Sequence, residues 1–307
     1  MAAIEIAGVT KTFGTHVAVD DLTLTVAEGS IYGFIGPNGS GKTTTLRMIM
    51  NILLPDRGQI RVLGRSEHAA AHDDVGYLPE ERGLYRKMQV GRLLRYYGAL
   101  KGAKAADIDR EIRFWLERLD LTKWIDHKVE ALSKGMSQKV QLIATVIARP
   151  RIVILDEPFS GLDPVNANVL RESVLELRQR GATIVFSTHD MAVAEEMCDR
   201  IFMIFKGRKV LDGTLDDIQA RYGHDTVRVR TEAGRAVLDG DPAVEAVNDY
   251  GNLQEVRVNG DPQALLARLI ARTRVSHFEV TRPSLHDIFV RIAQPDADAG
   301  AIAEVGR

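Results

Sequence analysis

The chain has 307 residues, a hydrophobic fraction of 45%, a charged fraction of 27% and a formal net charge of −2. These values are ordinary for a globular protein, and the length allows about two domains. A net charge this close to zero gives no indication of a surface that binds nucleic acid or an anionic membrane. The single cysteine, Cys198, excludes an internal disulfide framework, and the helix-like run around it predicts a small packed side chain.

The first nine residues mix polar and apolar side chains, so we expect no secretory signal there. No window of the sequence approaches the ~20 consecutive apolar residues that a membrane-spanning helix needs. A role at a membrane would therefore require a separate subunit that spans it.

Two kinds of strand are predicted along the first 215 residues. Alternation of apolar and polar residues at Ile4–Ile6 and Leu22–Val26 is typical of half-buried strands. Nearly continuous apolar runs indicate strands covered on both faces, and they occur at Ile31–Ile35, Ile152–Leu155 and Thr183–Ser187. Thr43–Leu53 follows the first of these runs and reads as a helix. Buried strands with intervening helices predict an open α/β sheet.

Between Val90 and Ala148 the periodicity becomes helical. Apolar residues recur at helical spacing at Leu93, Leu94, Tyr97 and Leu100, and again at Ile108, Ile112, Trp115, Leu116 and Leu119. We expect a helical subdomain inserted into the α/β pattern. Charge runs such as Arg110-Glu111 and Glu117-Arg118 are interpreted as solvated helix faces.

Beyond Leu215 the pattern predicts a small α+β domain, joined near residues 221–224. Its strands are expected at Thr226–Arg230, Glu255–Val258 and His277–Val280, and its helices at Pro262–Ala271 and Ser284–Ile292. Residues 295–307 are rich in Asp, Ala and Gly, which favours a disordered tail.

A complete G-x-x-x-x-G-K-[ST] motif follows the first buried strand, and it reads Gly36, Pro37, Asn38, Gly39, Ser40, Gly41, Lys42, Thr43. Its glycines let backbone N–H groups surround phosphate oxygens at the positive end of the next helix. Lys42 is expected to reach the β- and γ-phosphates, and the Thr43 hydroxyl is a candidate Mg²⁺ ligand beside Thr44.

Two carboxylates follow the second buried strand. Asp156 is predicted to hold the magnesium ion, and Glu157 is predicted to act as the general base on water. Adjacent carboxylates at a strand end repel each other without a cation, which favours a metal site over a solvated acidic turn.

Four elements then occur in a fixed order, Leu132–Gln138, Ile152–Glu157, Ser160–Asp163 and Ser187–His189. Together with the phosphate loop they resemble the ATP-binding subunit of ABC transporters, from Ile4 to about Leu215. The resemblance implies a P-loop NTPase cassette, in which a RecA-like α/β core carries an antiparallel β subdomain and a helical subdomain at about 88–148. We therefore expect an ATP-binding domain at 1–220, an accessory α+β domain at 221–294 and a tail at 295–307.

The same resemblance implies roles for individual residues, with ATP and Mg²⁺ as cofactors. His189 would bond the γ-phosphate, and Phe13 would stack on adenine, with a core phenylalanine as the alternative. Ser133 and Gly135 would contact the γ-phosphate of ATP held by a second subunit, and Asp163 would lie in the loop that crosses between the two subunits. A lone chain would then carry two half-sites.

Two sites, with three residues, depart from the most common family pattern. Glu80 stands where a glutamine usually senses the metal, either as a metal-contacting oxygen or as part of an exposed Glu80-Glu81 pair. In the signature segment, Lys134 and Met136 replace a glycine and a glutamine. Lys134 either places a positive charge beside the partner's phosphate or faces solvent.

These variants resemble a narrower group, the ATP-binding subunits of ABC-2-type permeases, which includes the bacterial sodium-exporting system. The segment Arg282–Phe289 resembles the element that ends the small C-terminal domain of that group, with His286 in place of an acidic residue. We expect a homo- or heterodimer that binds two Mg-ATP and drives a permease from the cytoplasmic face of the membrane, and the resemblance to this group favours export. The alternatives are a soluble ABC ATPase acting on ribosomes or DNA, and a nucleotide-binding regulator without turnover; no nucleic-acid partner is expected.

Overall fold

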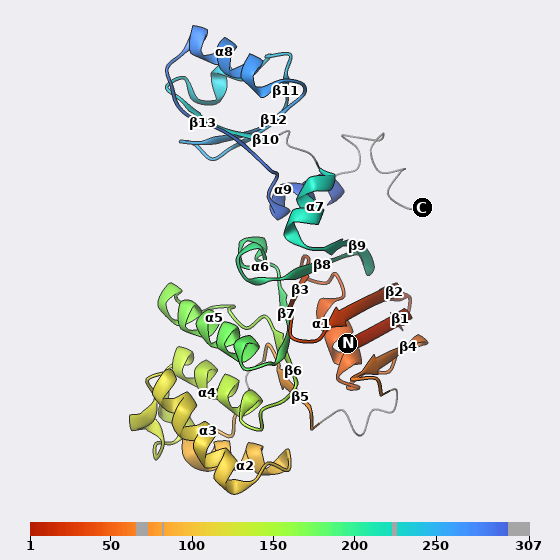
Figure 1. Ribbon diagram of the computed structural model, residues 1–307, viewed down its shortest axis with the longest axis vertical. Helices are drawn as coiled ribbons and strands as arrows, with labels where there is room; N and C mark the ends of the chain where they lie inside the picture. The colour runs from red at the N-terminus through yellow and green to blue at the C-terminus, as the bar shows by residue number, and fades with distance from the viewer. Residues whose placement is uncertain (66–72, 82, 223–225, 294–307) are drawn as a thin grey trace. The chain divides into compact units, whose positions relative to one another are not determined.

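The computed structural model describes residues 1–65, 73–81, 83–222 and 226–293. The chain divides into two compact units, Met1–Gly213 and Thr214–Arg307 (Figure 1). The division falls seven residues before the position 220 that the sequence suggests, because helix α7 (Leu215–Arg221) bonds within the second unit: Nε2 of Gln219 donates to the carbonyl oxygen of Pro283 over 2.9 Å. Residues 223–225 of the expected junction and the expected tail at 295–307 lie outside the described residues.

The first unit contains two sheets and six helices among its described residues. Its strands are β1 (Ala2–Phe13), β2 (His16–Ala27), β3 (Ile31–Ile35), β4 (Arg57–Val62), β5 (Val75–Leu78), β6 (Ile152–Asp156), β7 (Thr183–Thr188), β8 (Arg200–Phe205) and β9 (Arg208–Gly213). Its helices are α1 (Lys42–Ile49), α2 (Val90–Leu100), α3 (Ala105–Arg118), α4 (Lys134–Val146), α5 (Pro164–Gln179) and α6 (Met191–Met197). Helix α1 ends before the expected Leu53, since Asn51 adopts a left-handed backbone with φ 55°.

A six-stranded sheet of order β5-β6-β7-β3-β8-β9 forms the centre of this unit, and only β9 runs antiparallel to its neighbour. The predicted α/β sheet is confirmed. Alternate residues of its strands enter two separate cores: in β6, Ile152 and Ile154 face one core, and Val153 and Leu155 face the other. Burial on both faces explains why these strands read as continuous apolar runs.

The second sheet, β2-β1-β4, is antiparallel and shares one core with the central sheet around α1 (Figure 1). Leu46 and Met48 of α1 are fully buried in this core. The expected strands at 4–6 and 22–26 lie within β1 and β2, which pair with each other there.

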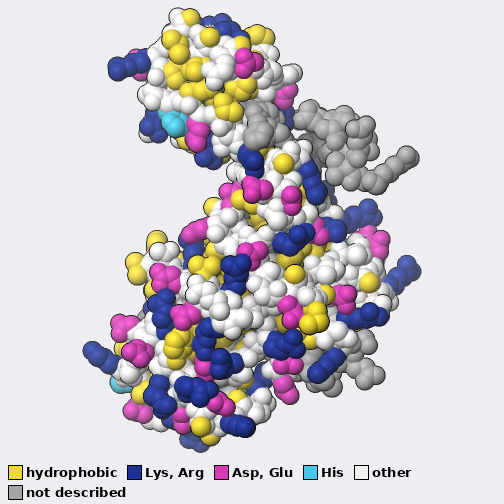
Figure 2. Space-filling view, viewed as in Figure 1, with side chains coloured by type: hydrophobic (Ala, Val, Ile, Leu, Met, Phe, Trp, Pro, Cys, Tyr) yellow, Lys and Arg dark blue, Asp and Glu magenta, His cyan; other side chains and the backbone are white. Residues whose placement is uncertain are grey.

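Helices α2, α3 and α4 form the predicted helical block, which packs on the other core of the central sheet. Basic and acidic side chains are interspersed over its surface (Figure 2), as expected for solvated helix faces. Glu111 is an exception, and its predicted exposure is wrong: its side chain is only 4% exposed.

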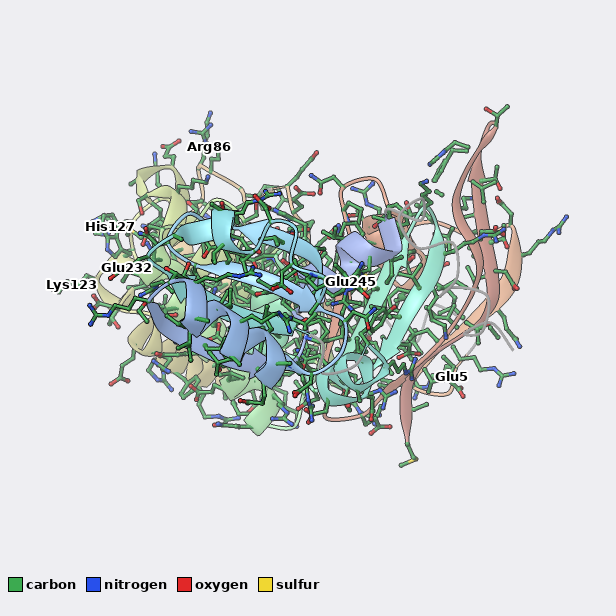
Figure 3. All side chains as sticks on the ribbon, turned by 90° about the horizontal axis from the view of Figure 1, so that it is seen from above. Glu5, Arg86, Lys123, His127, Glu232 and Glu245 are labelled. Carbon is green, nitrogen blue, oxygen red and sulfur yellow. The ribbon has the colours of Figure 1, made fainter. Side chains whose placement is uncertain are left out.

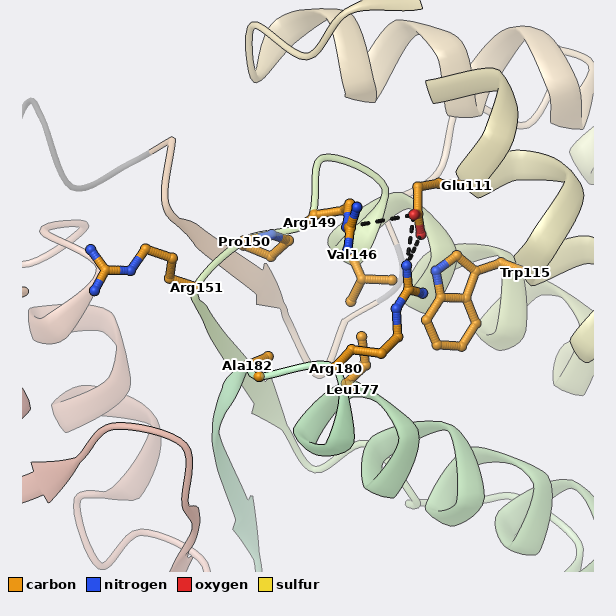
Figure 4. Close-up of a pocket in the computed structure, with 10 residues that line it drawn as sticks. Glu111, Trp115, Val146, Arg149, Pro150, Arg151, Leu177, Arg180 and Ala182 are labelled. Atoms are coloured by element: carbon orange, nitrogen blue, oxygen red, sulfur yellow. Dashed lines mark hydrogen bonds and ion pairs between the residues drawn. The ribbon is translucent and has the colours of Figure 1, made fainter. Parts of the chain in front are cut away.

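Glu111 of α3 forms an ion pair with Arg180, the residue that follows α5. Both of its carboxylate oxygens accept bonds from the Arg180 guanidinium, at 2.6 and 2.7 Å, and Arg149 lies 3.6 Å away (Figure 4). These residues line a cavity of about 290 Å³ near the amino ends of β6 and β7. Removal of Arg180 would leave the buried Glu111 carboxylate with Arg149 as its remaining partner, so we expect a loss of stability. A charge run in the sequence gave no sign of this partner 69 residues away.

The second unit is a four-stranded antiparallel sheet of order β11-β12-β10-β13 with helices α7, α8 and α9. Its strands are β10 (Thr226–Thr231), β11 (Val244–Asp249), β12 (Gln254–Val258) and β13 (Val275–Thr281), and its further helices are α8 (Pro262–Arg272) and α9 (Leu285–Ala293). Leu265 and Leu269 of α8 pack on the valines of β10 and β12.

No helix among residues 1–65, 73–81, 83–222 and 226–293 has the length and apolar character needed to cross a membrane.

Candidate functional site

The phosphate loop connects the buried end of β3 to the first turn of α1. Gly41 adopts φ 111°, and a Cβ there would lie 2.4 Å from the carbonyl oxygen of Ala18. Only glycine fits a backbone with this conformation and this neighbour. Helix α1 begins at the next residue, Lys42, so the free N–H groups of its first turn face the loop. The loop therefore has the backbone geometry that the motif predicts.

Lys42 is folded over this loop and is only 6% exposed. Its Nζ donates to the carbonyl oxygens of Gly36 at 2.7 Å and Pro37 at 3.2 Å, and lies 3.7 Å from Oε1 of Glu157. Burial lowers the pKa of the Lys42 ammonium, while the carboxylates of Glu157 and Asp156 oppose that shift. Two carbonyl oxygens thus hold the ammonium at the bend of the loop. A charged phosphate oxygen would be a stronger hydrogen-bond acceptor than these carbonyls.

Asp156, at the carboxyl end of β6, is positioned by two hydroxyl groups. The Ser187 Oγ donates to its Oδ1 over 2.5 Å and the Thr43 Oγ1 over 3.2 Å. Among the described residues its other oxygen, Oδ2, is buried and has no hydrogen-bond partner. A buried carboxylate oxygen beside a threonine hydroxyl suits a hard divalent cation. Asp156 and Thr43 thus fit Mg²⁺, and a cation held by them would neutralise charge on bound phosphates.

Glu157 adopts a left-handed backbone with φ 49°, which is unfavourable for a residue with a side chain. Its N–H donates to Oγ of Ser187 over 2.9 Å, which holds the backbone in place. Nδ1 of His189 lies 3.0 Å from its Oε2, whereas the histidine side chain is 55% exposed. The structure therefore brings Lys42, Glu157 and His189 together at one edge of the central sheet.

Lys42 and Glu157 border an open pocket of about 360 Å³. Its lining combines the phosphate loop with the end of the β1–β2 hairpin, namely Phe13, His16, Ala18, Asn38, Gly39, Gly41, Lys42, Thr43, Thr44, Glu80 and Glu157. Phe13 is 47% exposed, which speaks against the alternative of a core phenylalanine. Nζ of Lys11 lies 5.6 Å from its ring centroid and is fixed at 2.8 Å from Asp56. A partly exposed ring supported by a cation is a suitable platform for an aromatic base.

Ser133, Gly135 and Asp163 are not part of this pocket lining. Ser133 caps α4, since its Oγ accepts from the N–H of Met136, and Asp163 caps α5 by accepting from the N–H of Asn166. The hydrogen bond from Asn166 lowers the pKa of Asp163. The three residues lie at the starts of two neighbouring helices in the same chain, and their roles toward a second subunit remain predictions.

Sequence reasoning missed three residues of the site. Ser187 links Asp156 and Glu157, His16 lines the pocket beside Phe13, and Gln138 donates to the carbonyl oxygen of Pro158. A polar residue near the end of the buried strand β7 could have indicated Ser187. His16 and Gln138 are placed by tertiary packing alone.

Cys198 is a packed side chain, as the sequence predicts. It packs against Gly33, where a Cβ would lie 2.4 Å from the Cys198 Sγ, and burial raises the pKa of the Cys198 thiol.

Two family models match the chain. The ABC transporter family matches residues 19–160, and the C-terminal domain of ATP-binding proteins like DrrA1-3 matches residues 213–293. The second match begins where the structural division falls, at Gly213.

Relatives cover nearly the whole chain. An uncharacterized ABC transporter ATP-binding protein, YhaQ of Bacillus subtilis, is 40% identical over 92% of this chain and 95% of its own length. The Nod factor export ATP-binding protein I of Rhizobium sp. (strain N33) is 33% identical over 94% of this chain and 96% of its own.

A solved structure of an ATP-binding subunit of an ABC transporter is 32% identical, with a TM-score of 0.68, over 72% of this chain and 93% of its own. The family resemblance and the P-loop cassette fold inferred from the sequence are confirmed. The chain belongs to the family of ABC transporter ATP-binding proteins, with a DrrA-like C-terminal domain.

Proposed function

We propose that this chain is the ATP-hydrolysing subunit of an ABC exporter and works as a dimer on a separate membrane permease. The observation that carries the proposal is that Lys42 and Glu157 line one pocket with the phosphate loop, while Thr43 bonds Asp156 and His189 contacts Glu157. A protein that only binds nucleotide has no need for a carboxylate held between a lysine and a histidine.

Each residue has a distinct task in this proposal. The loop and Lys42 bind the phosphates, and Asp156 with Thr43 holds Mg²⁺. Glu157 accepts a proton from the attacking water, because its Oε1 is buried and its position is fixed. His189 orients Glu157 and contacts the γ-phosphate. ATP and water become ADP and phosphate.

Dimerisation follows from the positions of Ser133 and Gly135. Neither lines the pocket around the phosphate loop of its own chain, so we infer that both act on nucleotide held by a second copy or a related chain. Binding of two ATP molecules would close the pair, and hydrolysis would reopen it.

The direction of transport rests on the relatives. Export is named for the Nod factor relative, which is similar along nearly the whole chain, and the DrrA-like domain supports the ABC-2 group. The substrate is recognised by the permease in this proposal, and the chain itself places no constraint on it.

Two measurements test the proposal. Purified chain is expected to hydrolyse ATP in a Mg²⁺-dependent way, and Lys42→Ala is expected to lose nucleotide affinity. Tagged chain recovered from detergent-solubilised membranes is expected to carry an integral membrane protein with it. Recovery of ribosomal proteins instead, or turnover that survives Lys42→Ala, would contradict the proposal.

A further inference from the structure

The first two turns of α4 contact the 157–166 segment of the same chain at three places. A Cβ at Gly161 would lie 2.6 Å from Nζ of Lys134, and a Cβ at Gly135 would lie 2.9 Å from the Asn166 amide. One turn later, Gln138 donates to the carbonyl oxygen of Pro158. The signature segment is therefore packed against the segment that begins with its own chain's Glu157.

Lys134 faces a cavity formed by these contacts. The cavity has a volume of about 310 Å³, and its lining includes the carboxylates of Glu80, Asp156 and Glu157 together with Lys134. Glu80 and Glu157 also line the pocket of the phosphate loop, so the two spaces meet at these two residues. Glu80 and Lys134, two of the departures from the common family pattern, thus border one space in one chain.

Their charges act in opposite directions on a cation in this region. The cavity carries three carboxylates and one ammonium; burial lowers the pKa of Lys42, and the carboxylate of Glu80 is among the charges near enough to oppose that shift. A negative charge at position 80 attracts a divalent ion near Asp156, and a positive charge at position 134 repels it. Both side chains are exposed to solvent, so the effect of their charges on a bound cation must weaken as salt is added.

We propose that Lys134 acts in cis, opposing Glu80 and thereby setting the Mg²⁺ dependence of nucleotide binding in its own chain. The inference rests on the proposed function, because it requires that this site binds ATP with Mg²⁺. Gly161 is part of the arrangement: with φ 66° and Lys134 against it, a side chain at this position would displace the ammonium.

The test compares Kd for a fluorescent, non-hydrolysable ATP analogue in EDTA and in Mg²⁺, using full-length protein in 20 mM salt. Lys134→Gln is expected to raise the ratio Kd(EDTA)/Kd(Mg²⁺) by about threefold to fivefold, because the loss of a nearby positive charge removes its repulsion of a divalent ion. Glu80→Gln is expected to lower the ratio to a similar extent, and the double variant to return near wild type. These differences should largely vanish in 0.5 M salt.

Lys123→Gln is the matched control, since Lys123 is exposed at the rim of the helical block (Figure 3). It makes the same charge change and should leave the ratio at its wild-type value. A merely structural role of Lys134 would weaken both affinities together and leave the ratio unchanged in either salt.

Mixed dimers separate cis from trans action. In a pair of Lys134→Gln and Lys42→Ala chains, the intact phosphate loop belongs to the Lys134→Gln chain. Action in cis predicts the altered Mg²⁺ ratio there, whereas action in trans predicts a wild-type ratio. Pairing wild type with a Lys42→Ala/Lys134→Gln chain reverses both expectations.

The inference would be overturned if Lys134→Gln protein, without a second variant, showed the wild-type ratio. It would also be overturned if the ratio changed only in the pair of wild type with the Lys42→Ala/Lys134→Gln chain. If wild type itself shows no Mg²⁺-dependent nucleotide binding, the proposed function fails instead.

Discussion

His189 and Lys42 each lie near one carboxylate oxygen of Glu157, with Nδ1 of His189 3.0 Å from Oε2 and Nζ of Lys42 3.7 Å from Oε1. Since the Glu157 backbone is also left-handed, its carboxylate has little freedom to turn. A general base must be held within reach of its water, and this arrangement provides that restraint without a bound ligand.

Glu157→Gln retains the shape of the side chain and removes its basicity. We expect nucleotide binding to persist, turnover to fall by at least about 100-fold, and the ATP-bound dimer to accumulate. ATPase assays and size-exclusion chromatography with ATP measure these effects. Unchanged turnover would remove Glu157 as the base.

Ser187→Ala should damage both stability and metal binding. The hydroxyl donates to Asp156 and accepts from the N–H of Glu157, so its loss leaves buried polar groups unpaired, at a cost of about 1–3 kcal/mol. Urea unfolding gives the stability, and the Mg²⁺ dependence of nucleotide binding gives the functional effect. Ser173→Ala is the control, because that buried hydroxyl donates within α5, to the carbonyl oxygen of Val169. Equal Mg²⁺ dependence in both variants would show that Ser187 does not position Asp156.

Phe13→Ala should weaken nucleotide binding by about fivefold, since stacking on an aromatic ring contributes on the order of 1 kcal/mol. Phe13→Tyr retains the ring and should bind nearly as wild type. Equilibrium titration with a fluorescent ATP analogue measures both. If the alanine variant binds as tightly as wild type, Phe13 does not contact the base.

The second unit should lose stability as the pH rises. Burial raises the pKa of Glu255 from 4.5 to about 7, and its hydrogen bond with Asp287 of α9 adds to the shift. The folded state then binds more protons than the unfolded state between these values, so stability is complete below pH 4.5 and is lost through pH 7. Arg228, which lies 3.1 Å from Glu255, limits the loss, and we expect it to be on the order of 2 kcal/mol between pH 5 and 8.

Hydrogen exchange of the β12 and α9 amides in the full chain, corrected for intrinsic rates, measures this dependence. Glu255→Gln should flatten it because the amide does not titrate. A pH dependence that persists in this variant would assign the effect to another group.

The central sheet could be predicted because β3, β6 and β7 are buried on both faces, which leaves a local signal of continuous apolar residues. The phosphate loop is likewise encoded in eight consecutive residues. Contacts between distant segments carry no such signal: Glu111 meets Arg180, and Ser187 meets Asp156, only through packing. Strand β11 was not predicted, because its residues are mostly exposed and show no clear alternation.

The proposal that two chains share each active site is tested most directly by mixing two inactive variants. Ser133→Ala retains its own phosphate loop, and Lys42→Ala retains the serine that a partner would supply. If sites are composite, each variant alone should hydrolyse ATP poorly, and the mixed dimer should recover about one functional site of two. Absence of recovery, in samples where cross-linking demonstrates mixed dimers, would contradict a site built from two chains.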